Sequence, residues 1–189
     1  MIQTKEDLKY YIKRDRERYR VSKLRYYLEM LLQGESYKSI RYLKTLRYCE
    51  YYTNNKRKSF FHKLMANFYR LKLRRLGNIY RIKVDLNICG PGLRLVHLNG
   101  GIRMAAKSIG ENLTISTGCI IGRNRDKLPT VGNNVDVSVG AKIIGNVVVG
   151  DNVIVAPNSV VVKDVPSNCV VSGIPAIIIK RLEAQQKDN

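Results

Sequence analysis

Residues 131–165 read VGNNVDVSVGAKIIGNVVVGDNVIVAPNSVVVKDV, and an isoleucine or valine returns at every sixth position. The same period holds further toward the N-terminus, beyond a ten-residue interval between Ile121 and Val131. The nine repeat positions are all β-branched and apolar: Ile109, Ile115, Ile121, Val131, Val137, Ile143, Val149, Val155 and Val161. Neither an amphipathic helix nor a hairpin meander has a period of six, so each hexad is predicted to form one short strand and a turn.

The fourth residue after each repeat position is mostly small or apolar too, as at Leu113, Cys119 and Val135. Three hexads would close one triangular coil, with the Ile or Val side chains stacked inside, small residues at the tight positions, and Gly or Asn at the left-handed turns. A weaker continuation of the repeat runs back to Val84. The sequence therefore predicts a parallel β-helix of about four coils.

The interval between Ile121 and Val131 is four residues longer than one hexad, and the repeat holds its register on both sides. The additional residues, around Arg123–Thr130, are predicted to leave the coil as a loop. Loops held on a rigid scaffold often carry function.

The first 83 residues have a different composition. All 12 tyrosines and all three phenylalanines lie within residues 1–80, and residues 1–83 carry 23 Lys and Arg against 7 Asp and Glu, a net charge of +16. Residues 84–189 carry +3 of the total charge of +19. We therefore predict a basic α-helical domain over 1–83 and a β-helix domain with a C-terminal tail over 84–189.

Four helices are expected in the first domain. Thr4 and Asp7 resemble a capping box, and a second helix over about 21–33 is expected to end at Gly34 as a C-cap. Apolar residues at every third position from Ile40 to Cys49 indicate a third helix weakly. A fourth helix has an apolar face before Gly77, made of Phe60, Phe61, Leu64, Met65, Phe68, Leu71 and Leu76.

Several classes of protein are disfavoured. No apolar run approaches the roughly 18 residues that span a bilayer, and the first seven residues lack the apolar core of a signal peptide, so we expect a cytoplasmic protein. The cysteines contain no Cys-x-x-Cys pair, so we predict neither a metal site nor a disulfide framework but buried thiols. They are Cys49, Cys89, Cys119 and Cys169.

The repeat resembles that of the hexapeptide-repeat acyltransferases. Within that superfamily, four segments look like the serine acetyltransferase family: HLNGGI (97–102), VGAKIIGN (139–146), SVVVKDVP (159–166) and GIPA (173–176). The resemblance covers about residues 38–182. It implies a left-handed coil, a homotrimer and O-acetyl transfer from acetyl-CoA.

The resemblance implies that His97 is the general base, which removes a proton from an acceptor hydroxyl. The other histidine, His62, lies in the basic fourth helix and is interpreted as a surface residue. Family members orient the catalytic histidine with an upstream acidic residue. Asp85 is the candidate because it is the only carboxylate between Glu50 and Glu111, with a helix-to-coil cap as its alternative role.

Two departures from the family concern the acceptor. Serine acetyltransferases carry an aspartate directly before the catalytic histidine and a second histidine in the extruded loop, where this chain has Val96 and Leu128. Without these partners, free serine is not the expected acceptor. The resemblance to shorter relatives, which often acetylate sugar hydroxyls, implies a sugar acceptor in surface polysaccharide biosynthesis, with Asn124, Arg125 and Asp126 as its candidate hydrogen-bonding residues. The alternatives are a serine O-acetyltransferase of cysteine biosynthesis and a non-catalytic β-helix scaffold.

The resemblance also places the pantetheine arm of acetyl-CoA along the coil between two subunits. The small residues near it would be Gly122, Gly140, Ala141 and Ala156. The residues matched to the nucleotide phosphates are Lys163, Lys180 and Arg181, with ordinary solvated charges as the alternative.

One CoA does not account for a charge of +16 in residues 1–83. The apolar face of the fourth helix, flanked by basic residues, could form an amphipathic surface for peripheral contact with an anionic membrane. Bundle packing with solvated basic residues is the alternative and is slightly favoured. Nucleic-acid binding is not favoured because no recognised binding motif accompanies the charge.

Overall fold

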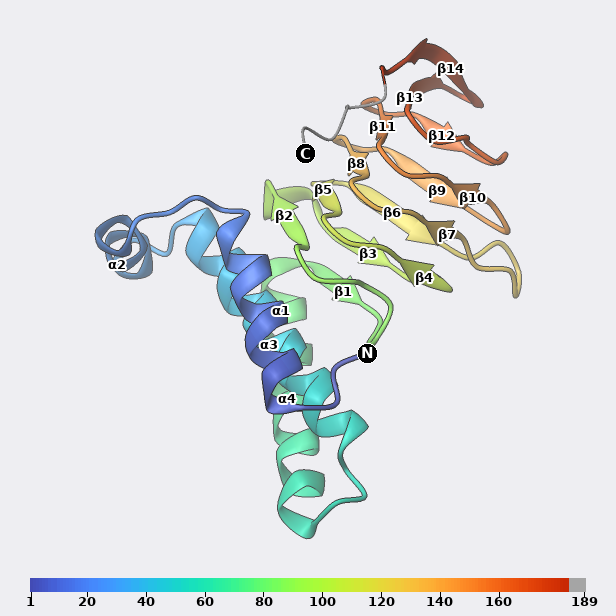
Figure 1. Cartoon of the computed structure of the whole chain (residues 1–189). Coiled ribbons are helices and arrows are strands. Elements are labelled where there is room, and N and C mark those ends of the chain that lie inside the picture. Colours follow the sequence, from blue (N-terminus) through green and yellow to red (C-terminus); the bar gives the residue numbers. More distant parts are fainter. Residues whose placement is uncertain (184–189) are drawn as a thin grey trace, which may run out of the picture.

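The structure, a computed structural model, describes residues 1–183. Four helices come first, and the remaining chain winds into a stack of coils above them (Figure 1). The helices are α1 (Lys5–Glu17), α2 (Lys23–Leu31), α3 (Glu35–Asn54) and α4 (Phe60–Tyr80). Within residues 1–183, none of the helices is both long and apolar enough to cross a membrane.

The predicted capping box of α1 is confirmed. The Thr4 hydroxyl accepts the Asp7 N–H at 3.0 Å, and the Asp7 carboxylate accepts the Thr4 N–H at 2.9 Å. The expected C-cap at Gly34 is wrong, because Gln33 adopts the left-handed conformation after α2 and Gly34 is the N-cap of α3. Gln33 therefore takes the position that a glycine commonly fills after a helix.

The fourth helix does not end at Gly77 but continues to Tyr80. A Cβ at Gly77 would lie 2.6 Å from the carbonyl oxygen of Ile82, so this glycine permits the close approach of β1. The expected apolar face of α4 is mostly exposed, since Ala66, Leu76 and Tyr80 are the buried residues of the helix. The side chains that expose more than half of their surface are Phe60, Phe61, Leu64, Phe68 and Leu71.

Fourteen short strands make up the rest of the described chain. They are β1 (Ile82–Val84), β2 (Arg94–Val96), β3 (Ile102–Met104), β4 (Ser108–Ile109), β5 (Thr114–Ser116), β6 (Cys119–Gly122), β7 (Thr130–Val131), β8 (Asp136–Val137), β9 (Lys142–Ile144), β10 (Val148–Val149), β11 (Val153–Val155), β12 (Val160–Val161), β13 (Cys169–Gly173) and β14 (Ala176–Arg181). A short 3-10 helix, η1 (Leu98–Gly100), lies between β2 and β3.

The strands form three sheets, which are parallel except for the β13–β14 pair. The five-stranded sheet has the order β1-β3-β6-β9-β12, the three-stranded sheet β10-β7-β4, and the six-stranded sheet β14-β13-β11-β8-β5-β2. Up to β13, strands that follow one another in the sequence lie in different sheets, and partners within a sheet come from successive coils. The predicted parallel β-helix is therefore confirmed, and the antiparallel β13–β14 pair closes its far end.

The repeat positions form the core of the β-helix. All nine Ile and Val side chains are buried, as are the companions from Leu113 to Val165 except Arg125, which is exposed in the loop. Each buried Ile or Val stabilises the fold by roughly 1.5–3 kcal/mol. The four cysteines are buried free thiols, as predicted.

Asparagine occupies one column of turns. Its members, all with φ between 53° and 59°, are Asn112, Asn134, Asn152 and Asn168. Each amide donates to the next at 2.8–3.0 Å, so a ladder of side chains runs along this corner. The prediction of Asn at left-handed turns is confirmed. Gly132 and Gly150 serve close packing instead, since a Cβ on either would meet atoms of the next coil.

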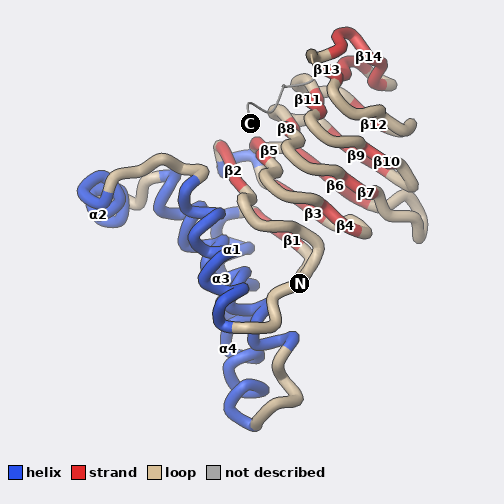
Figure 2. The backbone as a smooth tube through the Cα atoms, in the orientation of Figure 1, coloured by secondary structure: helices blue, strands red, loops and turns tan. Residues whose placement is uncertain are grey.

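The helices cover one end of the strand stack (Figure 2). One buried cluster joins Tyr42 and Leu46 of α3 to Leu93 and Leu95 of the first coil. The hydrophobic core therefore continues from the helices into the β-helix. The boundary expected after residue 83 falls within β1, and the division into two domains stays a prediction.

Candidate active site

The predicted site residues lie mainly in the turns at the two ends of the strands of the five-stranded sheet. Chain segments 97–101, 117–118, 139–140 and 157–158 turn from the six-stranded into the five-stranded sheet, and we name this column the His97 corner. Segments 105–107, 123–129 and 145–147 turn from the five-stranded into the three-stranded sheet, and we name this column the loop corner. The segment between β6 and β7 projects from the coil there (Figure 1).

His97 lies between β2 and η1 on the first coil. Its backbone is in the left-handed region, with φ 55°, and its side chain is 64% exposed. A residue other than glycine is uncommon in this conformation, which concentrates at functional sites. This exposure leaves the imidazole accessible to a ligand.

The helices hold the strand that carries His97. The N–H of Leu95 in β2 donates to the Tyr19 hydroxyl at 2.9 Å, and its carbonyl accepts hydroxyl protons from Tyr19 at 3.3 Å and Ser39 at 3.2 Å. Both groups of this residue would otherwise lie at an unpaired sheet edge. Burial raises the pKa of Tyr19 well above its usual range, so this phenol stays protonated and able to donate.

Glu35, at the start of α3, contacts His97 directly. Its Oε1 accepts the backbone N–H of His97, and its Oε2 lies 3.5 Å from Nδ1 of the imidazole. A carboxylate beside Nδ1 favours the tautomer with the proton on Nδ1 and the lone pair on Nε2. This arrangement leaves Nε2 for a proton transfer with a ligand.

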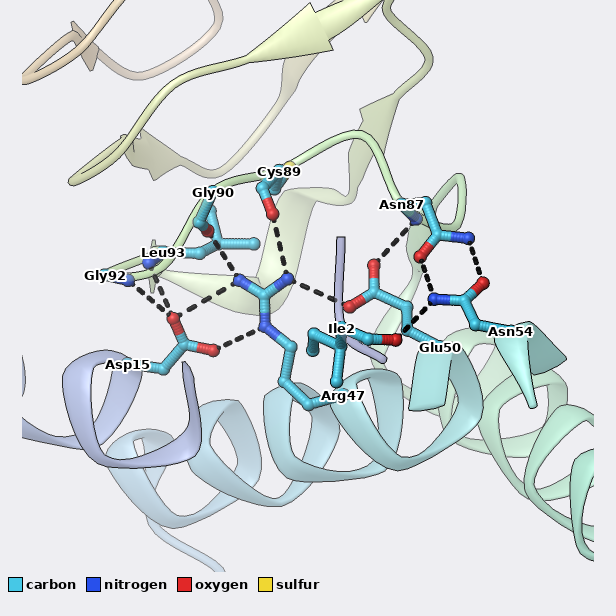
Figure 3. A network of polar contacts seen from close by, with 10 residues as sticks. All are labelled: Ile2, Asp15, Arg47, Glu50, Asn54, Asn87, Cys89, Gly90, Gly92 and Leu93. Atoms are coloured by element: carbon cyan, nitrogen blue, oxygen red, sulfur yellow. Dashed lines mark hydrogen bonds and ion pairs between the residues drawn. The ribbon is translucent and has the colours of Figure 1, made fainter. Parts of the chain in front are cut away.

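A buried network fastens α1 and α3 to the first coil (Figure 3). Arg47 of α3 donates to Asp15 of α1 at 2.8 Å and to Glu50 at 3.0 Å. Burial alone would lower the pKa of Arg47, but the two carboxylates raise it above its usual range. The backbone groups bound by Arg47 or Asp15 belong to Cys89, Gly90, Gly92 and Leu93. The network thereby fixes the segment that leads into β2.

Glycines in the left-handed conformation line the His97 corner. Gly101, Gly118 and Gly140 lie in successive turns with φ between 71° and 83°. The Gly118 N–H donates to Gly101 at 2.6 Å, and the Gly140 N–H donates to Thr117 at 2.9 Å, so the turns stack tightly. Glycine permits this close packing of the turns, and the side chains of Lys142 and Asn158 reach the same corner at Gly140.

Asp85 lies away from His97. It follows β1, and its N–H donates to Met104 at the end of β3, whereas His97 precedes the start of β3. Among the described residues, no hydrogen bond or ion pair joins Asp85 to His97. Its pairing with His97 stays a prediction that this arrangement does not support, and Glu35 occupies the expected position beside the imidazole.

The predicted acceptor residues lie at the loop corner. Asn124 and Lys127 exchange backbone hydrogen bonds of 3.1 and 3.2 Å, which fold the loop into a tight turn around Arg125 and Asp126. These four side chains are exposed. Strand β6, roughly 13 Å long, separates the loop from the His97 corner within one chain.

The predicted coenzyme residues also divide between the two corners. Gly140 and Ala156 lie at or beside the His97 corner, and Gly122 and Lys163 lie beside the loop corner. The side chain of Ala141 is fully buried, so only its backbone is left to face a ligand. Lys180 and Arg181 are exposed on β14 at the far end of the β-helix.

Sequence reasoning missed Glu35 as a partner of His97. Glu35 looks like an ordinary acidic residue in the first turn of a helix, where the helix dipole favours it. The two residues are 62 positions apart, and only the packing of α3 on the first coil brings them together.

Comparison with known proteins gives a consistent result. No family profile matches the chain. It is 38% identical over 96 residues to serine acetyltransferase of Synechococcus elongatus, covering 49% of this chain and 39% of that protein. It is 34% identical over 129 residues to serine acetyltransferase of Staphylococcus aureus strain Mu50, covering 64% and 61%. The chain thus spans less than two thirds of the length of these relatives.

The fold is also that of a solved serine acetyltransferase. The structure of the Brucella abortus strain S19 enzyme in complex with coenzyme A matches with a TM-score of 0.69 and 23% identity, over 94% of this chain and 70% of the other. This likeness extends through the helices as well as the coil. In its repeat, its sequence relatives and its fold, the chain is therefore serine acetyltransferase-like and similar to the hexapeptide-repeat acyltransferases.

Proposed function

We propose that the protein transfers an acetyl group from acetyl-CoA to a hydroxyl oxygen, with His97 as general base. The observation that carries this proposal is an exposed histidine, paired with a carboxylate, at a glycine-lined corner of a β-helix. The relatives named serine acetyltransferase and the fold shared with a coenzyme A complex support it. A non-catalytic scaffold offers no reason for the His97–Glu35 pair.

The proposed reaction has two steps. Nε2 of His97 removes the proton of the acceptor hydroxyl while its oxygen attacks the thioester carbonyl carbon. The resulting intermediate then loses the C–S bond, and the departing sulfur takes the proton from the imidazolium. The products are the O-acetyl ester and CoA with a free thiol, and His97 is neutral again. Glu35 stabilises the transient positive charge on the imidazole.

The test is acetyl transfer by His97→Asn, followed through release of the free thiol. We expect turnover to fall by roughly 100-fold or more, the usual contribution of a general base. His62→Asn is the matched control, because it changes the other histidine, whose ring contacts Ser59, and should leave turnover unchanged. Wild-type turnover in His97→Asn would exclude the mechanism.

For the acceptor, the names of the relatives favour serine, the alternative reading of the sequence. A sugar hydroxyl is the second candidate, and one observation favours it. Val96 precedes His97, and Leu128 lies in the loop, at positions where a carboxylate and an imidazole were expected for serine binding. Assays with serine and with sugar acceptors, each against the His97→Asn control, decide between them by thiol release.

We infer that the site is completed between subunits of a homotrimer. His97 and Gly140 lie at the His97 corner, while Asp126, Gly122 and Lys163 lie at or beside the loop corner. Both groups of residues can bind one acetyl-CoA and one acceptor only if the His97 corner of one copy faces the loop corner of another. Sedimentation equilibrium at micromolar concentration should give the trimer mass, and a monomer would contradict the inference.

We also propose a cytoplasmic location with peripheral membrane contact. The exposed Phe60, Phe61 and Phe68 on α4, with basic residues around them, form the surface that would meet anionic lipid. Binding to anionic vesicles that weakens as salt is raised supports it, and absence of binding at low salt removes it.

A further inference from the structure

A large cleft lies between α4 and the outer face of the five-stranded sheet, and its basic residues have no part in the proposed reaction. Its volume is about 1270 Å³. One wall is α4, the other is formed by β1 and β3, and Gly100, Gly101 and Gly118 of the His97 corner also line it. Sites for small organic ligands are typically ~300–1000 Å³, so the cleft has room for a ligand as large as a nucleotide.

Basic side chains from both walls line this cleft. They are Arg70 and Arg74 of α4, Arg81 at its C-terminal cap, Lys83 of β1 and Arg103 of β3. Asp85 is the one carboxylate in the described lining, which leaves a net charge of +4. None of the five cations takes part in the ion pairs found within residues 1–183. The cleft therefore lacks the carboxylates that would neutralise it.

Two of these cations are direct neighbours in the sheet. Lys83 of β1 and Arg103 of β3 are register partners, and both are exposed between buried residues of their strands, so both side chains stand on the outer face. Like charges opposite each other on adjacent strands are unfavourable. An anion bound between the walls would relieve this repulsion, and the concave shape strengthens the positive potential that attracts it.

We propose that this basic cleft binds a phosphate-bearing ligand other than the acetyl-CoA of the proposed reaction. Guanidinium groups match phosphate oxygens through paired, charge-assisted hydrogen bonds, and three of the four arginines come from α4 and its cap while Arg103 faces them from the sheet. A single carboxylate would need one such cation, whereas four arginines and a lysine suit a ligand with two or more negative charges. The inference does not depend on acetyl transfer and is tested by binding alone.

The experiment compares the full chain with two double variants of equal charge. The cleft variant is Arg70→Gln/Arg103→Gln, and the control is Arg57→Gln/Arg75→Gln, which removes two exposed arginines that do not line the cleft. Pyrophosphate binding is measured by calorimetry, and co-sedimentation with phosphatidylglycerol vesicles is the second arm. Circular dichroism establishes that both variants are folded.

If the ligand is a soluble phosphate compound, pyrophosphate binds the wild type and the control, and the cleft variant binds roughly tenfold or more weakly. If the phosphate belongs to a lipid headgroup, vesicle binding shows this difference instead. Equal binding by the two variants in both arms overturns the proposal, as does no binding by the wild type in either arm. An equal loss of CoA affinity in the cleft variant also overturns it, because the cleft would then be the coenzyme site.

Discussion

The β-helix and the helices stabilise the same molecule in different ways. In the β-helix, each Ile or Val packs on its equivalents in the adjacent coils, so stability is built from many similar and local contacts. In the helices, the buried Arg47 of α3 forms ion pairs with Asp15 of α1 and Glu50 of α3. It also donates hydrogen bonds to backbone carbonyls of the first coil. The β-helix therefore forms the framework of the site. The helical region supplies the Glu35 carboxylate and the hydrogen bonds to Leu95 that position His97.

The largest effect on stability is expected at this junction. Arg47→Met leaves Asp15 and Glu50 buried without their cation, and we expect a loss of about 3–5 kcal/mol in the free energy of unfolding. Urea denaturation measures it, with Arg41→Met at an exposed position of the same helix as the control. A loss below about 1 kcal/mol would mean that the network does not hold the helices on the coil.

The two regions also differ in how far the sequence predicts them. The six-residue period identifies the strands, the core and the extruded loop, because side chains of the β-helix face one another at a fixed separation along the chain. The helices have no such rule. Arg47 reads as one of many basic residues until Asp15 and the Cys89 carbonyl are seen around it, and the apolar residues of α4 turn out to be exposed.

A smaller effect, on the pH dependence of the unfolding free energy, is expected at Cys89, where the two regions meet. Burial raises the pKa of this thiol to about 12, while nearby Arg47 opposes the rise. A folded pKa above the unfolded value of about 9 means that its contribution is complete below pH 9 and declines as pH rises toward 12.

We therefore expect the unfolding free energy to fall less steeply in Cys89→Ala than in the wild type between pH 9 and 11. The difference is at most about 1.4 kcal/mol per pH unit, the value for one proton. Ser159→Ala, at another fully buried position of the coil, is the control and should retain the wild-type slope. Identical slopes in all three proteins would show that the thiol titrates alike in the folded and unfolded chain.

The candidate site was predictable on the coil and not on the helices. His97 and the glycine turns stand in segments that resemble the family, so their places follow from the repeat. For the acidic partner of His97, the sequence indicates Asp85, upstream within the first coil. The structure instead brings Glu35 to His97 through helix packing. Contacts between distant elements carry no periodic signal.

The most direct measurement is a double-mutant cycle between Glu35 and His97, with turnover as the readout. If Glu35 is a positioning residue that acts through the imidazole, Glu35→Gln lowers kcat roughly tenfold in the wild type, leaves KM for the acceptor unchanged, and has no further effect in His97→Asn. An equal loss in both backgrounds, or no loss in the wild type, would contradict the claim that the helices complete the active corner of the coil.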